Sequence, residues 1–201
     1  MQPFRSQQAL RHHLFLWAPL LLLSGFLQLA GFKQEWQFDR ELIEQGQYWR
    51  LLSGHLVHAN ASHWALNMAG LALVAFFFSR YGTLLQWLGV LILSALFAGL
   101  GCYLLEPQVQ VAVGLSAVLH GLFLYGALHE IRRYPRSGYL LLALLFIKLT
   151  WELLHGPIPG SELIAGGRVA TVVHLYGAMG ALAVWLATGC CQLSRPRSNW
   201  R

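Results

Sequence analysis

Apolar stretches of about 20 residues, separated by short polar connections, limit what this chain can fold into more than any other feature. Such a stretch is long enough to cross the hydrocarbon core of a bilayer as an α-helix, which satisfies its own backbone hydrogen bonds. The sequence therefore predicts an all-α membrane protein, a six-transmembrane-helix bundle in a single domain over residues 1–201. The predicted spans are about 14–32, 63–79, 83–105, 115–131, 138–155 and 169–190.

The composition agrees with a membrane protein. Hydrophobic residues make up 56% of the chain and charged residues 11%, whereas an ordinary soluble domain has roughly 25% charged residues. The formal net charge of +6 comes from fourteen Lys and Arg that lie mostly between the apolar stretches, where they serve as topology signals. We therefore predict a lipid bilayer, and no nucleic acid, as a partner of this chain.

The first apolar stretch, 14–32, follows a basic leader with Arg5 and Arg11 and could be a signal peptide. Its length fits a full span better, and no A-x-A-like cleavage site follows it. The three cysteines show no metal-ligand spacing and no paired framework. Neither a disulfide scaffold nor a metal site is predicted from them.

Basic residues predict the orientation. Nine of the fourteen Lys and Arg fall on one side of a six-span bundle, and most acidic residues fall on the other. By the positive-inside rule both termini are cytoplasmic, and the aromatic loop 33–62 lies at the outer interface. The nine residues are Arg5, Arg11, Arg80, Arg132, Arg133, Arg136, Arg195, Arg197 and Arg201.

Spans two, four and six run in the same direction in this topology, so their N-terminal ends share the outer face. At a rise of about 1.5 Å per residue, Ser116 lies about 24 Å above Arg132 and His174 about 21 Å above Thr188. The two side chains therefore reach a similar depth. The stretch 106–114 has to descend into the membrane region beside protein or a water-filled cavity, and hydrolysis also needs water.

Ser116 begins the fourth span, where free N–H groups and the positive end of the helix dipole stabilise an oxyanion. Gly114 allows a tight turn just before it. His174, near the start of the sixth span, can take a proton from serine and return it to a leaving amine. Small residues three and six positions later allow a neighbouring helix to approach. Alternatively, Ser116 could be a small residue that only packs between helices, and His174 could be a core histidine that hydrogen-bonds to a backbone carbonyl.

The second span begins with His63 and Asn67, which share a helix face and can aim two donors at one point. An oxyanion hole needs such donors. Asn67 could instead hydrogen-bond between helices. His58, His55 and Asn60 lie nearer to water and could simply be solvated.

No carboxylate is expected at the depth of Ser116 and His174, because the acidic residues considered for this place fall in loops or at the inner end of a span. The sequence therefore favours a Ser-His dyad over a triad. Tyr176 or Tyr125 could orient the base by stacking. The acidic residues in question are Glu106, Glu130 and Glu162.

These residues together resemble the rhomboid intramembrane serine protease family, over nearly the whole chain and in the order of its second, fourth and sixth helices. The resemblance implies Ser116 as nucleophile, His174 as general base, and His63, Asn67 and the Ser116 N–H as oxyanion donors. The motifs that carry it are Trp49-Arg50, the H-x4-H-x3-N pattern of His58, His63 and Asn67, the G-x-S of Gly114 to Ser116, and the H-x2-G of His174 and Gly177.

Two residues depart from the family's pattern. The family usually has Gly after the serine, where this chain has Ala117, and Tyr four residues after it, where this chain has His120. The stretch resembles the rhombosortase branch, whose members process proteins with a C-terminal Gly-Gly, apolar helix and basic-tail sorting signal. The resemblance thus implies membrane-anchored protein substrates and no cofactor, with His120 touching the substrate, the base or a lipid headgroup. It also implies a bacterial inner-membrane protein, and with the orientation given above we expect the active site to open to the outer, periplasmic face.

Two other functions stay open at this point. Five histidines gather toward one face, which is compatible with a haem or metal protein, although that function leaves Ser116 unexplained and no H-E-x-x-H motif occurs. A catalytically inactive rhomboid that binds membrane segments is the other. The five histidines are His55, His58, His63, His120 and His174.

Overall fold

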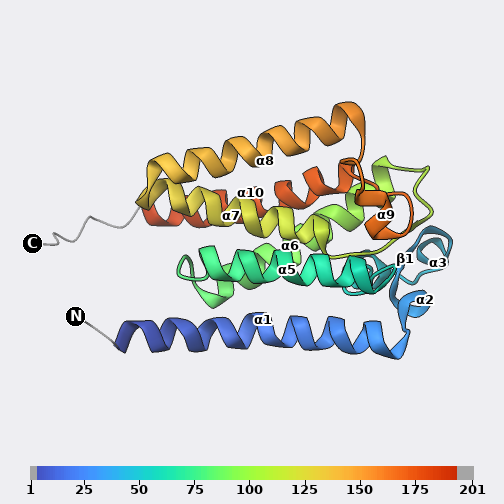
Figure 1. Cartoon of the computed structure of the whole chain (residues 1–201), viewed down its shortest axis with the longest axis horizontal. Helices are drawn as coiled ribbons and strands as arrows, with labels where there is room; N and C mark the ends of the chain where they lie inside the picture. Colours follow the sequence, from blue (N-terminus) through green and yellow to red (C-terminus); the bar gives the residue numbers. More distant parts are fainter. Residues whose placement is uncertain (1–3, 194–201) are drawn as a thin grey trace, which may run out of the picture.

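The computed structural model describes the backbone of residues 4–193 and the side chains of residues 17–188. In this part of the chain six long helices form a bundle (Figure 1), and each overlaps one predicted span. Arg195, Arg197 and Arg201, which contributed to the predicted orientation, lie outside the described residues. The long helices are α1 (Phe4–Ala30), α5 (Ala61–Phe78), α6 (Leu84–Leu105), α7 (Ser116–Arg133), α8 (Pro135–His155) and α10 (Val172–Leu193).

Helices α5, α7 and α10 all begin at one end of the bundle, where the segment between α1 and α5 also lies (Figure 1). We call this the loop end. The start of α1 and the end of α10 lie at the opposite end, which we call the terminal end. This arrangement agrees with the expectation that spans two, four and six start at a common face. Which side of a membrane each end faces stays a prediction.

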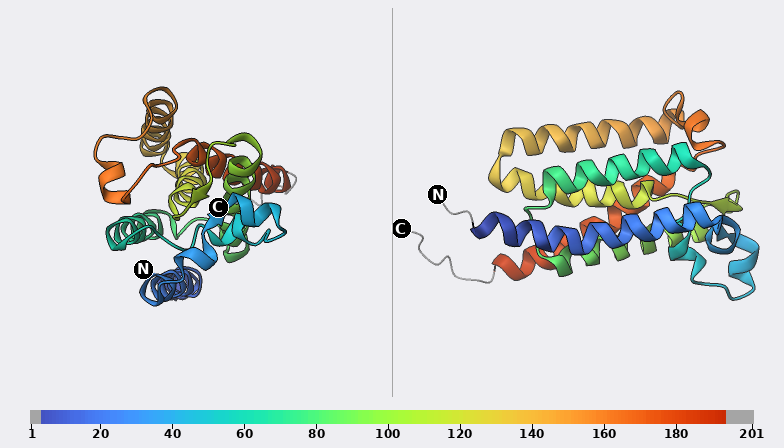
Figure 2. Two further views of the ribbon diagram at one scale, coloured as in Figure 1. Left: turned by 90° about the vertical axis from the view of Figure 1, so that its right-hand side faces the viewer. Right: turned by 60° about the horizontal axis from the view of Figure 1, so that its bottom comes forward.

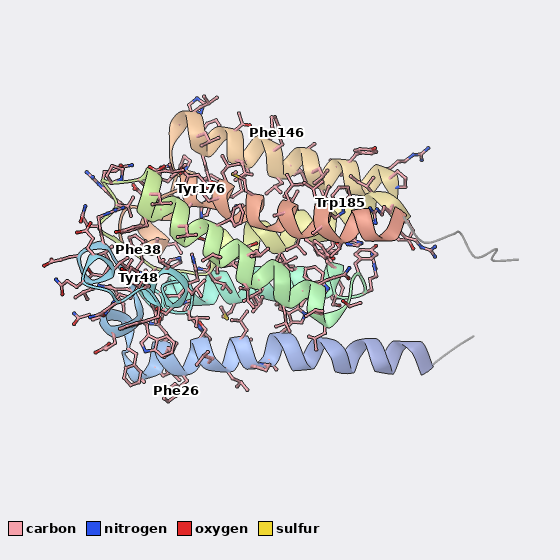
Figure 3. All side chains as sticks on the ribbon, turned by 180° about the vertical axis from the view of Figure 1, so that it is seen from behind. Phe26, Phe38, Tyr48, Phe146, Tyr176 and Trp185 are labelled. Carbon is pink, nitrogen blue, oxygen red and sulfur yellow. The ribbon has the colours of Figure 1, made fainter. Side chains whose placement is uncertain are left out.

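Three helices, α5, α6 and α8, are long and apolar enough to cross a membrane by length and composition. Shorter apolar helical stretches occupy Trp17–Ala30 and Val172–Thr188. Large apolar side chains are exposed along the bundle, among them Phe26 and Phe146, which point outward in Figure 3. These features support an integral membrane protein. The complete set of six spans and the single domain over 1–201 stay predictions.

Helix α7 lies in the middle of the bundle, against α5, α6, α8 and α10 (Figure 2, left). Glycines of α10 allow this close packing. A Cβ at Gly177 would overlap the backbone of Ala117 on α7, and a Cβ at Gly180 would overlap the backbone of Leu93 on α6. The expectation that small residues after His174 let neighbouring helices approach is therefore confirmed.

The segment between α1 and α5 folds against the loop end. It contains α2 (Lys33–Trp36), β1 (Phe38–Asp39), α3 (Arg40–Glu44) and α4 (Arg50–Ser53). Strand β1 pairs antiparallel with β2 (Val111–Ala112), so the stretch 106–114 finds backbone partners, as its expected descent into the bundle requires.

Arg40 fastens this segment to α6. Its guanidinium donates to the carbonyls of Tyr103 and Cys102, at 2.8 and 2.9 Å, at the C-terminal end of the helix. These carbonyls have no partner within α6, so the arginine satisfies them and also complements the negative end of the helix dipole. Tyr48 and Trp49 of the same segment are exposed, as expected for aromatic residues of a loop at a membrane interface.

Candidate active site

Ser116 is the first residue of α7 and follows a turn that favours glycine. Gly114 has φ +116°, and a Cβ there would lie 2.7 Å from Cε1 of His63. The Gly114 N–H donates to the carbonyl of Gly54 at 3.0 Å, which fixes the turn. N–H groups in the first turn of a helix have no partner within the helix. The turn therefore presents the Ser116 hydroxyl beside donors that a ligand can use.

The Ser116 hydroxyl is hydrogen-bonded to the imidazole of His174, with Oγ 2.9 Å from Nε2. His174 lies in the first turn of α10 and is almost fully buried. Helix counting gave the two residues a similar depth, and in the structure they meet where α7 and α10 pack through Gly177. A hydroxyl and an imidazole in this contact can act as a nucleophile and its base.

A carboxylate that the sequence analysis missed completes this chain of contacts. Glu152 on α8 places Oε2 2.9 Å from Nδ1 of His174, and its other oxygen, Oε1, accepts from Nζ of Lys148 at 2.6 Å. The expectation that no carboxylate lies at this depth is therefore wrong. The signal was present, because Lys148 and Glu152 are two charges four residues apart inside an apolar span, where charges are rare and usually functional.

The contacts of His174 fix its neutral tautomer. An ionised carboxylate only accepts hydrogen bonds, so Nδ1 carries the hydrogen that is donated to Glu152. Nε2 then has a free lone pair and accepts from the Ser116 hydroxyl. This is the tautomer that a general base needs, because the proton of the nucleophile has to arrive at Nε2.

His120 stacks on His174, with ring centroids 4.2 Å apart and planes inclined by 15°. Its Nδ1 donates to the backbone carbonyl of Ser116 at 2.7 Å, because a carbonyl only accepts. The suggestion that Tyr176 or Tyr125 orients the base by stacking is wrong. Tyr176 donates to Glu106, and the ring of Tyr125 packs on Trp87 and His129.

The two predicted oxyanion donors differ in position. His63 lines the same cavity as Ser116 and His174. Asn67 is buried behind it, and its Nδ2 donates to the His63 carbonyl one turn earlier in α5, at 2.9 Å. That contact uses one of the two amide hydrogens. The oxyanion role of both residues stays a prediction.

Of the three residues near the start of α5 that were expected to lie nearer to water, His58 is buried, whereas His55 and Asn60 are partly exposed. Asn60 caps α5 by accepting from the His63 N–H at 2.7 Å. His58 is buried, with its ring edge-on to that of His63 at 5.2 Å. Burial, with a smaller contribution from His63, lowers the pKa of His58 to about 3. His55 lies against the Gly114 and Ala95 carbonyls, and burial lowers its pKa as well.

A cavity of about 290 Å³ opens at Ser116 and His174. Arg50 contributes to its wall and donates to the carbonyls of Gln34 and Gln37, both at 2.9 Å, which holds the loop segment in place. Trp49, the other half of the predicted Trp-Arg motif, is 57% exposed and is not among the residues that line the cavity.

His120, Glu152 and His174 bring one potential metal ligand each to within 4.8 Å of one another. Their existing contacts fit a hydrogen-bonded network better than a metal site. The two imidazole rings are stacked, so their in-plane lone pairs do not converge on one point. The Lys148 ammonium already neutralises Glu152 and would repel a second cation.

Comparison with known proteins identifies the family. The family model of the rhomboid domain matches residues 45–189. The chain is 32% identical over 81 residues to "Putative rhomboid protease YdcA" of Bacillus subtilis (strain 168), covering 40% of this chain and 41% of that protein. It is 31% identical over 177 residues to "RHOMBOID-like protein 2" of Arabidopsis thaliana, covering 83% of this chain and 48% of that protein.

The match therefore spans less than half the length of each of these relatives. The family model, in contrast, covers most of this chain, including the serine turn and the histidine at the start of α10. The chain belongs to the rhomboid family.

Proposed function

We propose that this chain is an intramembrane serine endopeptidase, with Ser116 as nucleophile and His174 as general base. The observation that carries the proposal is the 2.9 Å contact between Ser116 Oγ and His174 Nε2 at the edge of a cavity. Membership of the rhomboid family supports it, because such proteins act on membrane-protein substrates within the bilayer. The proposed setting is a six-span bundle in a bacterial inner membrane, with cytoplasmic termini and the loop end facing the periplasm.

In the proposed reaction Ser116 Oγ attacks the carbonyl carbon of a peptide bond while its proton moves to His174 Nε2. The tetrahedral intermediate collapses, the C–N bond breaks, and His174 returns this proton to the leaving amine. Water then attacks the ester carbon while His174 accepts one of its protons. The bond between this carbon and Oγ breaks, His174 returns the proton to Oγ, and the new C-terminal carboxylate is released. The cavity provides a route by which water reaches a site between helices.

The negative oxygen of each intermediate needs donors that are already in place. The Ser116 N–H at the start of α7 is one, and the His63 side chain on the cavity wall is the second. Asn67 keeps one amide hydrogen besides that given to the His63 carbonyl. These groups on α5 and α7 form the proposed oxyanion hole.

The proposed substrates are membrane-anchored proteins cleaved near the outer face, and the proposed branch is rhombosortase. Ala117 takes the place of the family's usual glycine and narrows the space beside Ser116, which favours a small residue before the cleaved bond. A C-terminal Gly-Gly followed by an apolar helix and a basic tail meets this requirement. In this proposal His120 contacts the base, His174, on which its ring stacks. It can also touch a substrate.

The test is co-expression of a reporter protein ending in Gly-Gly, an apolar helix and a basic tail with the wild-type chain or with Ser116→Ala. We expect a shortened reporter only with the wild type, and mass spectrometry of its new C-terminus gives the cleavage site. Equal cleavage by a purified, folded Ser116→Ala protein would falsify the assignment.

A serine-directed fluorophosphonate separates an enzyme from an inactive rhomboid that only binds membrane segments. We expect the wild-type chain to be labelled at Ser116 and the Ser116→Ala variant to be unlabelled. A folded wild-type protein that is neither labelled nor active on the reporter would be a binder.

A further inference from the structure

The ion pair between Lys148 and Glu152 is not explained by packing of α8. Nζ lies 2.6 Å from Oε1, and the side chains are 34% and 5% exposed. Removing two charges from water is costly, and a pair of apolar residues would stabilise a helix in this position at least as well. We therefore expect this charged pair within an apolar span to interact with residues outside α8.

We propose that Glu152 is a positioning residue for His174, with Lys148 as its counter-ion, so that the site is a Ser116–His174–Glu152 triad. This inference rests on the proposed peptidase function. The two carboxylate oxygens have separate partners, because Oε1 faces Lys148 on the same helix and Oε2 faces Nδ1 of His174 on α10. Glu152 thus links a cation on α8 to the base.

The carboxylate has two effects on His174. It holds the hydrogen on Nδ1, which leaves Nε2 free to accept the serine proton, and together with the stacked ring of His120 it limits rotation of the imidazole. When Nε2 takes the proton, the ring becomes positive next to an anion that is already in place. In a buried site of low dielectric this attraction is larger than in water.

Lys148 keeps the resting site close to neutral. Without it, an ionised Glu152 at 6% exposure would have no cationic partner among residues 17–188 until His174 is protonated. With it, the carboxylate stays an acceptor throughout the reaction and has no need to take the proton itself. Within the part of the chain whose side chains are described, Ser116 and His120 from α7 and His63 from α5 also face His174.

A purely structural role for Glu152 has to be separated from positioning. The same residue ties α8 to the start of α10, since its backbone carbonyl accepts from the Thr171 hydroxyl at 3.3 Å. That contact does not need the carboxylate. A variant that keeps the size and backbone of the side chain but loses its charge therefore isolates the effect on His174.

The experiment measures fluorophosphonate labelling of Ser116 and reporter cleavage by the full chain in detergent. For Glu152→Gln we expect the maximal labelling rate and kcat to fall about 100-fold or more, because an amide can donate to Nδ1 and stabilise the wrong tautomer. KM and the half-saturating fluorophosphonate concentration stay within about threefold of the wild-type values, because Glu152 acts through His174. Glu152→Asp, which retains the charge, recovers part of kcat.

Glu162→Gln is the matched control, since Glu162 is an exposed carboxylate of α9 (Ser161–Ala165) at the same end of the bundle. It is expected to leave kcat unchanged. If Glu152→Gln does not fold, the double variant Lys148→Met/Glu152→Gln removes both charges and leaves no unpaired one. The same loss of kcat is expected for it.

Wild-type kcat in folded Glu152→Gln, or in the folded double variant, overturns the triad and leaves the dyad. A loss that appears only as a raised KM, or that Glu152→Asp does not relieve, also overturns positioning of the base. The proposed function fails separately, when the wild-type chain itself is neither labelled at Ser116 nor active on the reporter.

Discussion

Two carboxylates at opposite ends of the bundle are each buried and paired with a cation, but their hydrogen-bond networks differ. Glu130, near the terminal end of α7, accepts from Arg80 at 3.2 Å, from Ser137 at 2.8 Å and from the Tyr81 hydroxyl. Glu152, near the loop end of α8, has a lysine and a histidine. Both carboxylates are therefore buried and paired with a cation.

The two hydrogen-bond networks differ in the residues that they connect. The partners of Glu130 join the α5–α6 turn to α7 and the start of α8, and none of them lines the cavity described above. Burial raises the pKa of Tyr81, and the bond to Glu130 adds to this, so the phenol stays a donor. The network of Glu152 continues through His174 to a hydroxyl at that cavity. A buried charge pair indicates a catalytic role when its hydrogen-bond network includes a group that a substrate can contact.

An effect on cleavage as large as that of Glu152→Gln is expected for His63→Ala, at the cavity that the Glu152 network reaches and the Glu130 network does not. The variant removes a proposed oxyanion donor from the cavity wall, which typically lowers kcat about 100-fold or more. Steady-state cleavage of the reporter measures it. His155→Ala, at an exposed histidine of the loop end, is the control and should retain wild-type kcat. An unchanged kcat in folded His63→Ala would remove this residue from the oxyanion hole.

A smaller effect is expected for His120→Ala, which deletes the ring that stacks on His174. Such ring contacts contribute about 0.5–1.5 kcal/mol, so kcat should fall about 2- to 13-fold. His120→Tyr should lose less, because a phenol ring can still stack on the base. Steady-state cleavage of the reporter by the two purified variants gives the two kcat values to be compared. If tyrosine is as damaging as alanine, the Nδ1 contact to the Ser116 carbonyl matters more than the stacking.

The smallest effect on turnover is expected for Glu130→Gln at the terminal end. Removing the charge weakens bonds to three side chains and should lower the free energy of unfolding by about 1–3 kcal/mol. The exposed Arg80 keeps the loss toward the lower part of this range. Thermal unfolding in detergent should give a lower Tm while kcat of the folded fraction stays within about twofold of wild type. A fall in kcat as large as that of Glu152→Gln would contradict the comparison.

The sequence alone predicted where the long helices lie and how deep the site residues lie along the helix axes. Apolar length places the long helices, and the rise per residue brings Ser116 and His174 to a similar depth. Gly114 and Gly177 are recognisable because a tight turn and a close helix contact each need a missing Cβ. These inferences depend only on distances along a helix, which the sequence contains.

The partners of His174 could not be obtained in the same way. Depth along a helix axis does not say which way α8 is rotated about that axis, nor which neighbour it faces. Glu152 reaches His174 only because α8 turns that face toward α10, and His120 meets the same ring only because α7 lies between its neighbours. The sequence by itself determined where the nucleophile and base lie along their helices. Only the tertiary structure decided their lateral contacts, since these depend on how separate helices are rotated and packed together.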